Sequence, residues 1–235
     1  MKGISFVVKG DLACFRNPAT LSFFETFLCP QRTAILGLIG ALLGYSEKDT
    51  YEALAKKLKV GIEILEINGF AREITRLRNL KGKEEEKTPT MRNLLVRPKY
   101  RIYLGLEENE LLEKISRAAE EPKFPPYLGS SDFLAFPVTE ITLFDTLTSR
   151  KENLFECVVP EVEKIDWFIT DRIKDNRRGQ LVIPAKRYKT VRDWKVTDRG
   201  RVPEFIDLIV GYNCLIKTSS RLPCYYFAEK PIVLF

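Results

Sequence analysis

Apolar and polar residues alternate along the first 140 residues with two periods, one near two residues and one near 3.6. Residues 4–9, Ile-Ser-Phe-Val-Val-Lys, predict a β-strand. The segment 31–43 predicts a helix, because Pro30 suits a first helical turn and Gly44 suits a C-cap. This helix is apolar on nearly every side, so we expect it to be buried.

Further elements of this region follow from the same two periods. They are, in chain order, a short helix after a Ser46 cap, strands over 60–64 and 70–78, a polar tip over 81–90, a strand over 100–104, an acidic helix over 107–121 and a strand over 133–138. Apart from the short helix and the basic strand over 70–78 with its polar tip, the order is β-α-β-β-α-β. That order is typical of a ferredoxin-like or RNA-recognition-motif (RRM-like) domain.

The last hundred residues predict a less regular, β-rich region. Its candidate strands cover 154–159, 180–184, 205–216 and 224–235. We therefore expect an α+β protein with a ferredoxin-like domain over 1–138 and a β-rich C-terminal domain over 139–235. No change in composition marks a linker between the two.

The positive charge of the chain is concentrated in two stretches. The net charge is +6, yet residues 172–201 carry +8 and residues 68–101 carry +6, which leaves −8 for the rest. Aromatic residues are interleaved with the basic ones in both stretches. Such segregation favours a polyanion such as nucleic acid lying along part of the surface.

Residue usage excludes several kinds of chemistry. The chain has no histidine, which removes histidine-based triads and histidine-ligated metals. Its five cysteines form no Cys-x-x-Cys pair, so we expect reduced, buried thiols and neither a metal nor another cofactor. The longest apolar run, 34–43, is too short to span a bilayer, and no secretory signal is evident. We expect a cytoplasmic protein with no membrane partner.

An ordered set of segments resembles the RAMP superfamily of CRISPR-associated proteins. The segments are 7–16 (Val-Val-Lys-Gly-Asp-Leu-Ala-Cys-Phe-Arg), 30–33 (Pro-Gln-Arg-Thr), 36–44 (Leu-Gly-Leu-Ile-Gly-Ala-Leu-Leu-Gly), 101–104 (Arg-Ile-Tyr-Leu) and 126–129 (Pro-Tyr-Leu-Gly). The chain is most similar to the type I (Cascade) subunit family numbered five, which caps the 5′ handle of the CRISPR RNA (crRNA). The resemblance covers nearly all of 1–138, and the closing residues fit it more loosely.

This resemblance implies a ribonucleoprotein subunit that binds the crRNA 5′ handle and contacts the Cascade backbone and large subunits. A basic β-hairpin, the thumb, would lie at about 70–98. The implied phosphate contacts on the thumb are Arg72, Arg76, Arg78, Lys81, Lys83, Arg92 and Arg97. Arg72, Arg76 and Arg78 occupy even positions and would share one face of a regular strand. An alternative explanation is that these charges prevent aggregation of an exposed hairpin edge, which would give the same pattern.

Two further groups of residues are candidates for RNA contact. One is the start of the first helix at Gln31 and Arg32, where the free backbone N–H groups and the positive end of the helix dipole would favour a phosphate. Arg32 would add positive charge there, and Arg16 should lie nearby. Lys186, Arg187 and Tyr188 combine charge with a ring that could stack on a base, and could equally face the large subunit or target DNA.

Catalysis is the main alternative. One branch of the family cleaves precursor crRNA with tyrosine, lysine and histidine side chains. Without histidine that pattern cannot be complete here, although Tyr45 is a conceivable remnant. We therefore favour a non-catalytic subunit over a metal-independent endoribonuclease. An unrelated RRM-like protein is a third possibility, but 100–104 match its aromatic motif only in part.

Overall fold

The computed structural model describes residues 1–18, 20, 23–79, 86–135, 137–160, 162–169, 181–197 and 200–235, with the backbone alone at 77–79, 86–88, 195–197 and 200–201. The helices are α1 (Arg32–Leu43), α2 (Glu47–Leu54) and α3 (Asn109–Glu120). The strands are β1 (Lys2–Lys9), β2 (Leu12–Ala13), β3 (Lys59–Glu66), β4 (Gly69–Asn79), β5 (Glu86–Val96), β6 (Lys99–Leu106), β7 (Thr139–Phe144), β8 (Thr148–Phe155), β9 (Val159–Pro160), β10 (Ile165–Ile169), β11 (Ile183–Thr197), β12 (Gly200–Tyr212), β13 (Cys214–Phe227) and β14 (Lys230–Ile232). The protein is thus mixed α and β, with strands predominating.

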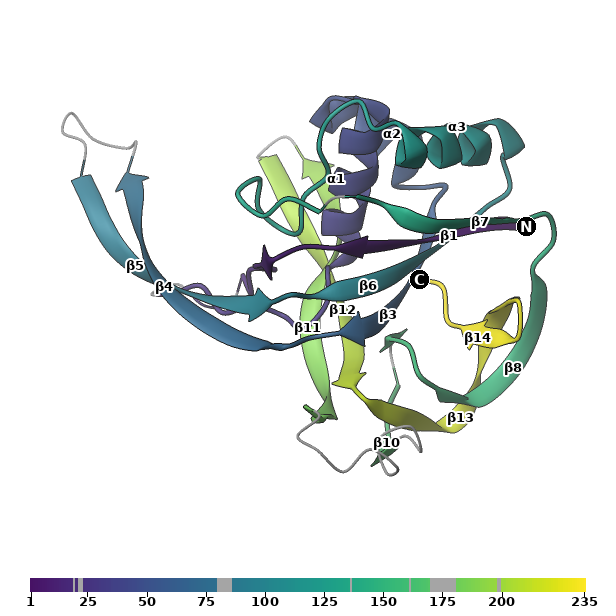
Figure 1. The fold of residues 1–235 in the computed structure, drawn as a ribbon. Helices are drawn as coiled ribbons and strands as arrows, with labels where there is room; N and C mark the ends of the chain where they lie inside the picture. The colour runs from purple at the N-terminus through teal and green to yellow at the C-terminus, as the bar shows by residue number, and fades with distance from the viewer. Residues whose placement is uncertain are drawn as a thin grey trace.

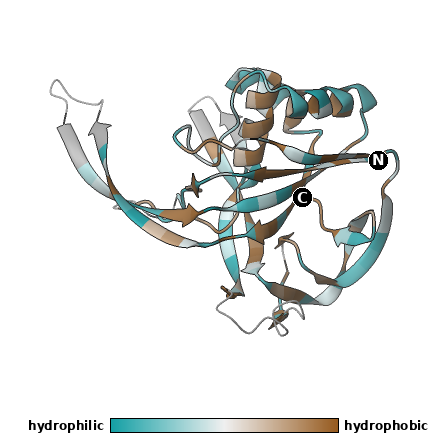
Figure 2. Ribbon diagram, in the orientation of Figure 1, coloured by the Kyte–Doolittle hydropathy of each residue, from teal (hydrophilic) through white to brown (hydrophobic). Residues whose placement is uncertain are grey.

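A four-stranded antiparallel sheet in the order β3-β6-β1-β7 forms the centre of the N-terminal part. The three helices gather on one side of it (Figure 1). Alternate residues of β1 and β6, among them Phe6 and Tyr100, point to that side and join the largest core cluster. The hydropathy colouring shows that α1 is largely apolar (Figure 2).

The helix signals of the sequence match the observed helix ends. The 31–43 prediction is realised as α1, and Gly44 closes it in the left-handed conformation with φ 73°. Ser46 caps α2, because its hydroxyl accepts a hydrogen bond from the Asp49 backbone N–H at 3.2 Å. Local sequence therefore determines where both helices begin or end.

The fourth strand of this sheet is not where the sequence predicted it. Residues 133–135 form a packed loop, in which Leu128 N–H donates to the Phe133 carbonyl at 2.7 Å. Phe133 and Ala135 are buried there without being part of a strand. The edge strand is β7, so the sheet continues six residues beyond 138. A short apolar run is equally compatible with a buried loop and with a strand, which explains the error.

The C-terminal part is built from two further sheets. β13 pairs with β8, β10 and β14, while β11 and β12 form a long ribbon whose strand β12 also pairs with β9. The strand predicted over 205–216 is in fact divided by Asn213, which has φ 59°. The strand predicted over 224–235 is divided in the same way, by a turn at Ala228 with φ 55°. Asn adopts this left-handed conformation more readily than most residues, so the break at Asn213 had a weak signal.

All five cysteines are unpaired and buried, as the sequence predicted. Burial raises the pKa of the Cys29 and Cys157 thiols to about 12. Both thiols are therefore protonated near neutral pH and poorly nucleophilic. Among the described residues, no group of metal-ligating side chains is present, and no helix has the length and apolarity needed to cross a membrane.

Candidate nucleic-acid interface

The predicted thumb is a β-hairpin that projects away from the rest of the molecule (Figure 1). β4 and β5 pair without a register shift from Gly69 opposite Val96 to Asn79 opposite Glu86. Arg72 and Arg76 both lie on one exposed face of β4, as their even positions predicted. The side chain of Arg78, with Lys81 and Lys83, lies outside the described residues.

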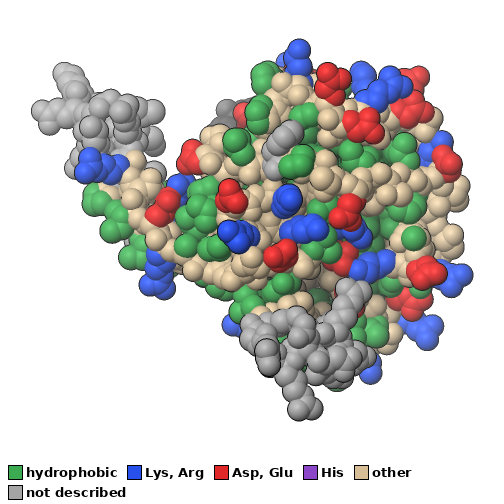
Figure 3. Space-filling view, viewed as in Figure 1, with side chains coloured by type: hydrophobic (Ala, Val, Ile, Leu, Met, Phe, Trp, Pro, Cys, Tyr) green, Lys and Arg blue, Asp and Glu red, His purple; other side chains and the backbone are tan. Residues whose placement is uncertain are grey.

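The same hairpin face also exposes large apolar side chains. Phe70 is 55% exposed, Ile74 75% and Met91 45%, and Ile74 lies directly opposite Met91. Hydrophobic and basic side chains are seen together along the hairpin in Figure 3. No ion pair reaches Arg72 or Arg76 from any side chain that the structure describes. We call Phe70, Arg72, Ile74, Arg76 and Met91 the outer thumb face.

Arg92 lies on the opposite side of the hairpin and has protein partners. Its guanidinium pairs with Glu73 across the hairpin and with Asp132 at 3.1 Å, and lies over the Phe133 ring at 4.7 Å. Only 12% of the Arg92 side chain is exposed. This arrangement fixes the base of the thumb to the loop 127–135. Arg92 would have to leave these partners to contact a phosphate.

Arg16 and Gln31 meet close to the base of the thumb. The exposed Arg16 guanidinium lies 3.9 Å from the centroid of the Phe24 ring, and Gln31 donates its side-chain amide to the Arg16 carbonyl at 3.0 Å. Phe24 is in turn hydrogen-bonded to β5, because its backbone N–H donates to the Met91 carbonyl at 2.8 Å. Arg97 is exposed between β5 and β6, with φ 46°. Arg16 and Arg97 therefore place charge at the base of the thumb.

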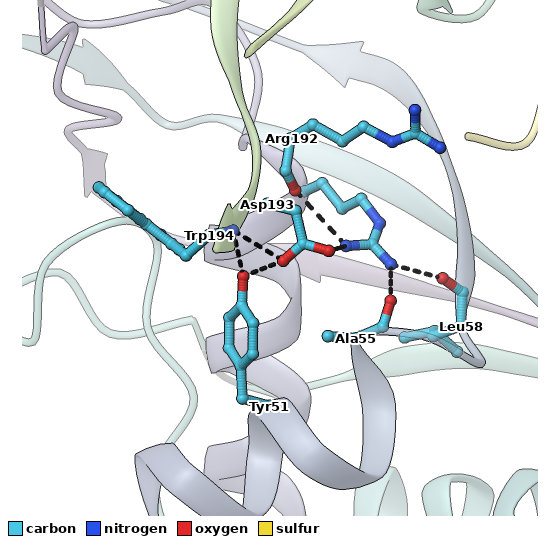
Figure 4. A network of polar contacts seen from close by, with 7 residues as sticks. Tyr51, Ala55, Leu58, Arg192, Asp193 and Trp194 are labelled. Carbon is cyan, nitrogen blue, oxygen red and sulfur yellow. Dashed lines mark hydrogen bonds and ion pairs between the residues drawn. The ribbon is translucent and has the colours of Figure 1, made fainter. Parts of the chain in front are cut away.

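Arg32 is buried and already engaged within the protein (Figure 4). Its guanidinium donates to the carbonyls of Ala55 and Leu58 and pairs with Asp193 at 3.6 Å. Burial lowers the pKa of the Arg32 guanidinium, and the Asp193 carboxylate opposes that shift. Arg32 thus ties the start of α1 to β11, which is a structural role.

The 186–188 segment divides between exposed and packed side chains. Lys186 and Arg187 are exposed, but Arg187 donates to the Glu163 carbonyl at 3.0 Å and pairs with Asp207 at 3.4 Å. Tyr188 is half-buried and meets Phe27 edge-on, with ring centroids 5.7 Å apart. Its ring already serves the core, so Lys186 is the member of this group most open to a ligand.

Sequence reasoning did not single out a cavity of about 520 Å³ beside α1. Trp194 of β11 and Tyr45 both line it, and Lys123 lies next to Gly44, directly before Tyr45. The available signal was an aromatic residue inside a basic stretch. Its position against α1 could not be inferred, because 142 residues separate Asp193 from its partner Tyr51.

Two solved structures with a similar fold have CRISPR in their titles. A structure titled "Crystal structure of a CRISPR protein from Archaeoglobus fulgidus" shares 13% identity with a TM-score of 0.57, covering 99% of this chain and 98% of that one. A chain of a "CRISPR RNA-guided surveillance complex" shares 13% identity with a TM-score of 0.53, covering 93% and 91%. A further likeness, to "Crystal structure of Cas protein", has a TM-score of 0.42 and spans 62% of that chain.

The family assignment comes from the sequence. The family described as CRISPR-associated protein (Cas_Cas5) matches residues 3–188, and the chain belongs to this family. The resemblance drawn from the ordered segments is therefore confirmed. A search of curated proteins finds no match to the chain.

Proposed function

We propose that this protein is a crRNA-binding structural subunit of a type I CRISPR surveillance complex, acting in antiviral defence. It would bind the 5′ handle of the guide RNA and contact the backbone and large subunits. The outer thumb face carries this proposal. Its two arginines lack a described ionic partner, and its apolar side chains are exposed, so the face is suited to a partner carrying both phosphates and apolar groups.

We also propose that the N-terminal part is a ferredoxin-like domain. When α2, β2 and the hairpin strands β4 and β5 are set aside, the element order is β1-α1-β3-β6-α3-β7. The sheet order β3-β6-β1-β7 agrees with the ferredoxin-like topology. Because β7 completes this sheet, we place the boundary to the β-rich C-terminal part after Phe144. The proposed partners accord with the family and with a structural neighbour from an RNA-guided complex.

Replacing Arg72 and Arg76 together with alanine tests the proposed RNA contact. If each arginine neutralises about one phosphate, the slope of log K against log salt should weaken by roughly 0.7 per arginine. Affinity for single-stranded handle RNA should fall on the order of tenfold near 0.1 M salt. A filter-binding titration over a salt series measures both quantities.

The matched control removes two positive charges elsewhere. Lys114 and Arg117 are exposed on α3, so Lys114→Ala with Arg117→Ala changes the net charge equally. This control should keep the wild-type slope and affinity. If the thumb variant behaves like the control, the outer thumb face is not the RNA-binding surface.

A second candidate function is cleavage of precursor crRNA, favoured by the proximity of Lys123 to Tyr45. A Cβ built on Gly44 would lie 2.5 Å from Lys123 Cγ. The Lys123 side chain therefore packs against Gly44, the residue directly before Tyr45. We expect no site-specific product from repeat RNA, with or without chelator. A defined product that disappears in Tyr45→Phe, seen on a denaturing gel, would instead establish the endoribonuclease.

A further inference from the structure

Five aromatic side chains contribute to the lining of the cavity beside α1. Its aromatic lining consists of Tyr45, Tyr51, Phe124, Tyr127 and Trp194. On the α1 side the wall includes Gly37, Gly40 and Ala41, with Thr50 of α2 packed directly against Gly40. The volume of about 520 Å³ lies in the range of small-ligand sites.

The charges around this cavity favour an uncharged, planar occupant. Its lining contains no lysine or arginine among the described residues, and its one carboxylate belongs to Glu47. A phosphate inside would therefore be poorly stabilised. The exposed Lys123, which lies beside Gly44 and directly precedes Phe124 of the lining, could instead meet a phosphate outside the cavity. A nucleobase within and its phosphate outside would satisfy both requirements.

The backbone at Trp194 is held by a polar network that includes Tyr51, which also lines the cavity. The Tyr51 hydroxyl donates to the Asp193 carboxylate, the Trp194 backbone N–H donates to Asp193 Oδ1 at 2.9 Å, and Arg32 pairs with the same carboxylate. Figure 4 shows the Trp194 side chain directed away from Arg192. Because this backbone is fixed in advance, only the side-chain torsions of Trp194 lose freedom when a base stacks on its ring.

We infer that this cavity receives one nucleobase of the bound RNA, stacked on the indole of Trp194. The inference rests on the proposed RNA-binding function and adds a second contact, separate from the outer thumb face. Stacking on an aromatic side chain accepts any base, because every base has a π-face. Arg32, Asp193 and Tyr51 are then positioning residues for the backbone that carries Trp194.

The chain has two tryptophans, which makes a direct test possible. Trp167→Phe, on the exposed strand β10, leaves Trp194 as the sole indole reporter. Single-stranded handle RNA should quench its fluorescence, with a midpoint equal to the Kd from filter binding. Trp194→Ala should weaken RNA binding about tenfold. Unlike the thumb variant, it should keep the salt slope, because no charge is removed.

The possible outcomes separate this inference from the proposed function. If filter binding shows saturation with RNA while Trp194 emission in the Trp167→Phe protein stays unchanged, the base site is wrong and the thumb contact stands. If neither method detects RNA binding, both fail. Should Trp194→Ala not fold, Trp194→Phe replaces it, and we expect that variant to retain most of the affinity.

Discussion

Replacing Arg32 with methionine should lower the free energy of unfolding by about 3 kcal/mol. The variant leaves the Ala55 and Leu58 carbonyls without their guanidinium donor, and the partly buried Asp193 carboxylate without its cation. Losing one partner of a buried pair is costly, because the remaining groups stay desolvated. Urea unfolding followed by circular dichroism measures the loss.

The control for this substitution is Arg16→Met. Arg16 is exposed and makes no ion pair within the described part of the chain, so the change should stay within about 0.5 kcal/mol. A wild-type urea midpoint for Arg32→Met would contradict the structural role assigned to Arg32. In that case its guanidinium would again be a candidate for phosphate contact.

Gly129→Ala should destabilise the protein by about 3 kcal/mol or more. Gly129 has φ 88°, and a Cβ there would lie 2.0 Å from the Cys14 carbonyl oxygen. Both the backbone conformation and the close approach exclude a side chain, and the neighbouring group is backbone that cannot rotate away. Because the loop 127–135 carries Asp132, we also expect the base of the thumb to loosen.

The matched control is Gly37→Ala in the middle of α1. A Cβ there would lie 3.6 Å from Tyr127 Oη, an ordinary contact, and alanine favours helix over glycine by about 1 kcal/mol. This variant should be as stable as the wild type or slightly more so. Thermal unfolding measures both, and limited proteolysis reports on the thumb. Equal melting temperatures for the two variants would refute the packing argument.

The fold was predictable where its cause was local. The apolar period and the caps predicted α1 and α2, and the family resemblance implied the hairpin formed by β4 and β5. The fourth strand was misplaced because its position depends on which segment pairs with β1, either 133–138 or β7. Pairing with a distant strand cannot be predicted from local sequence. The break at Asn213 was missed because β12 and β13 read as one continuous run.

The candidate site was predictable to the same degree. Period-two alternation placed Arg72 and Arg76 together on one exposed face. Charge type alone could not distinguish them from Arg92 and Arg32, whose carboxylate partners come from distant segments. Trp194 was missed for a similar reason, since its surroundings are formed by α1 and α2.

The tie between Arg32 and Asp193 also bears on how the chain folds. Arg32 and Asp193 are separated by about 160 positions, and the Val158 N–H donates a hydrogen bond to the Ile62 carbonyl across about 96 positions. Closing loops of this length costs conformational entropy before the contacts that stabilise the folded chain can form. Such topologies therefore fold slowly. During synthesis, α1 would emerge long before β11 and would leave its apolar surface partly uncovered. A chaperone, or early association with another subunit, would protect that surface in the interval.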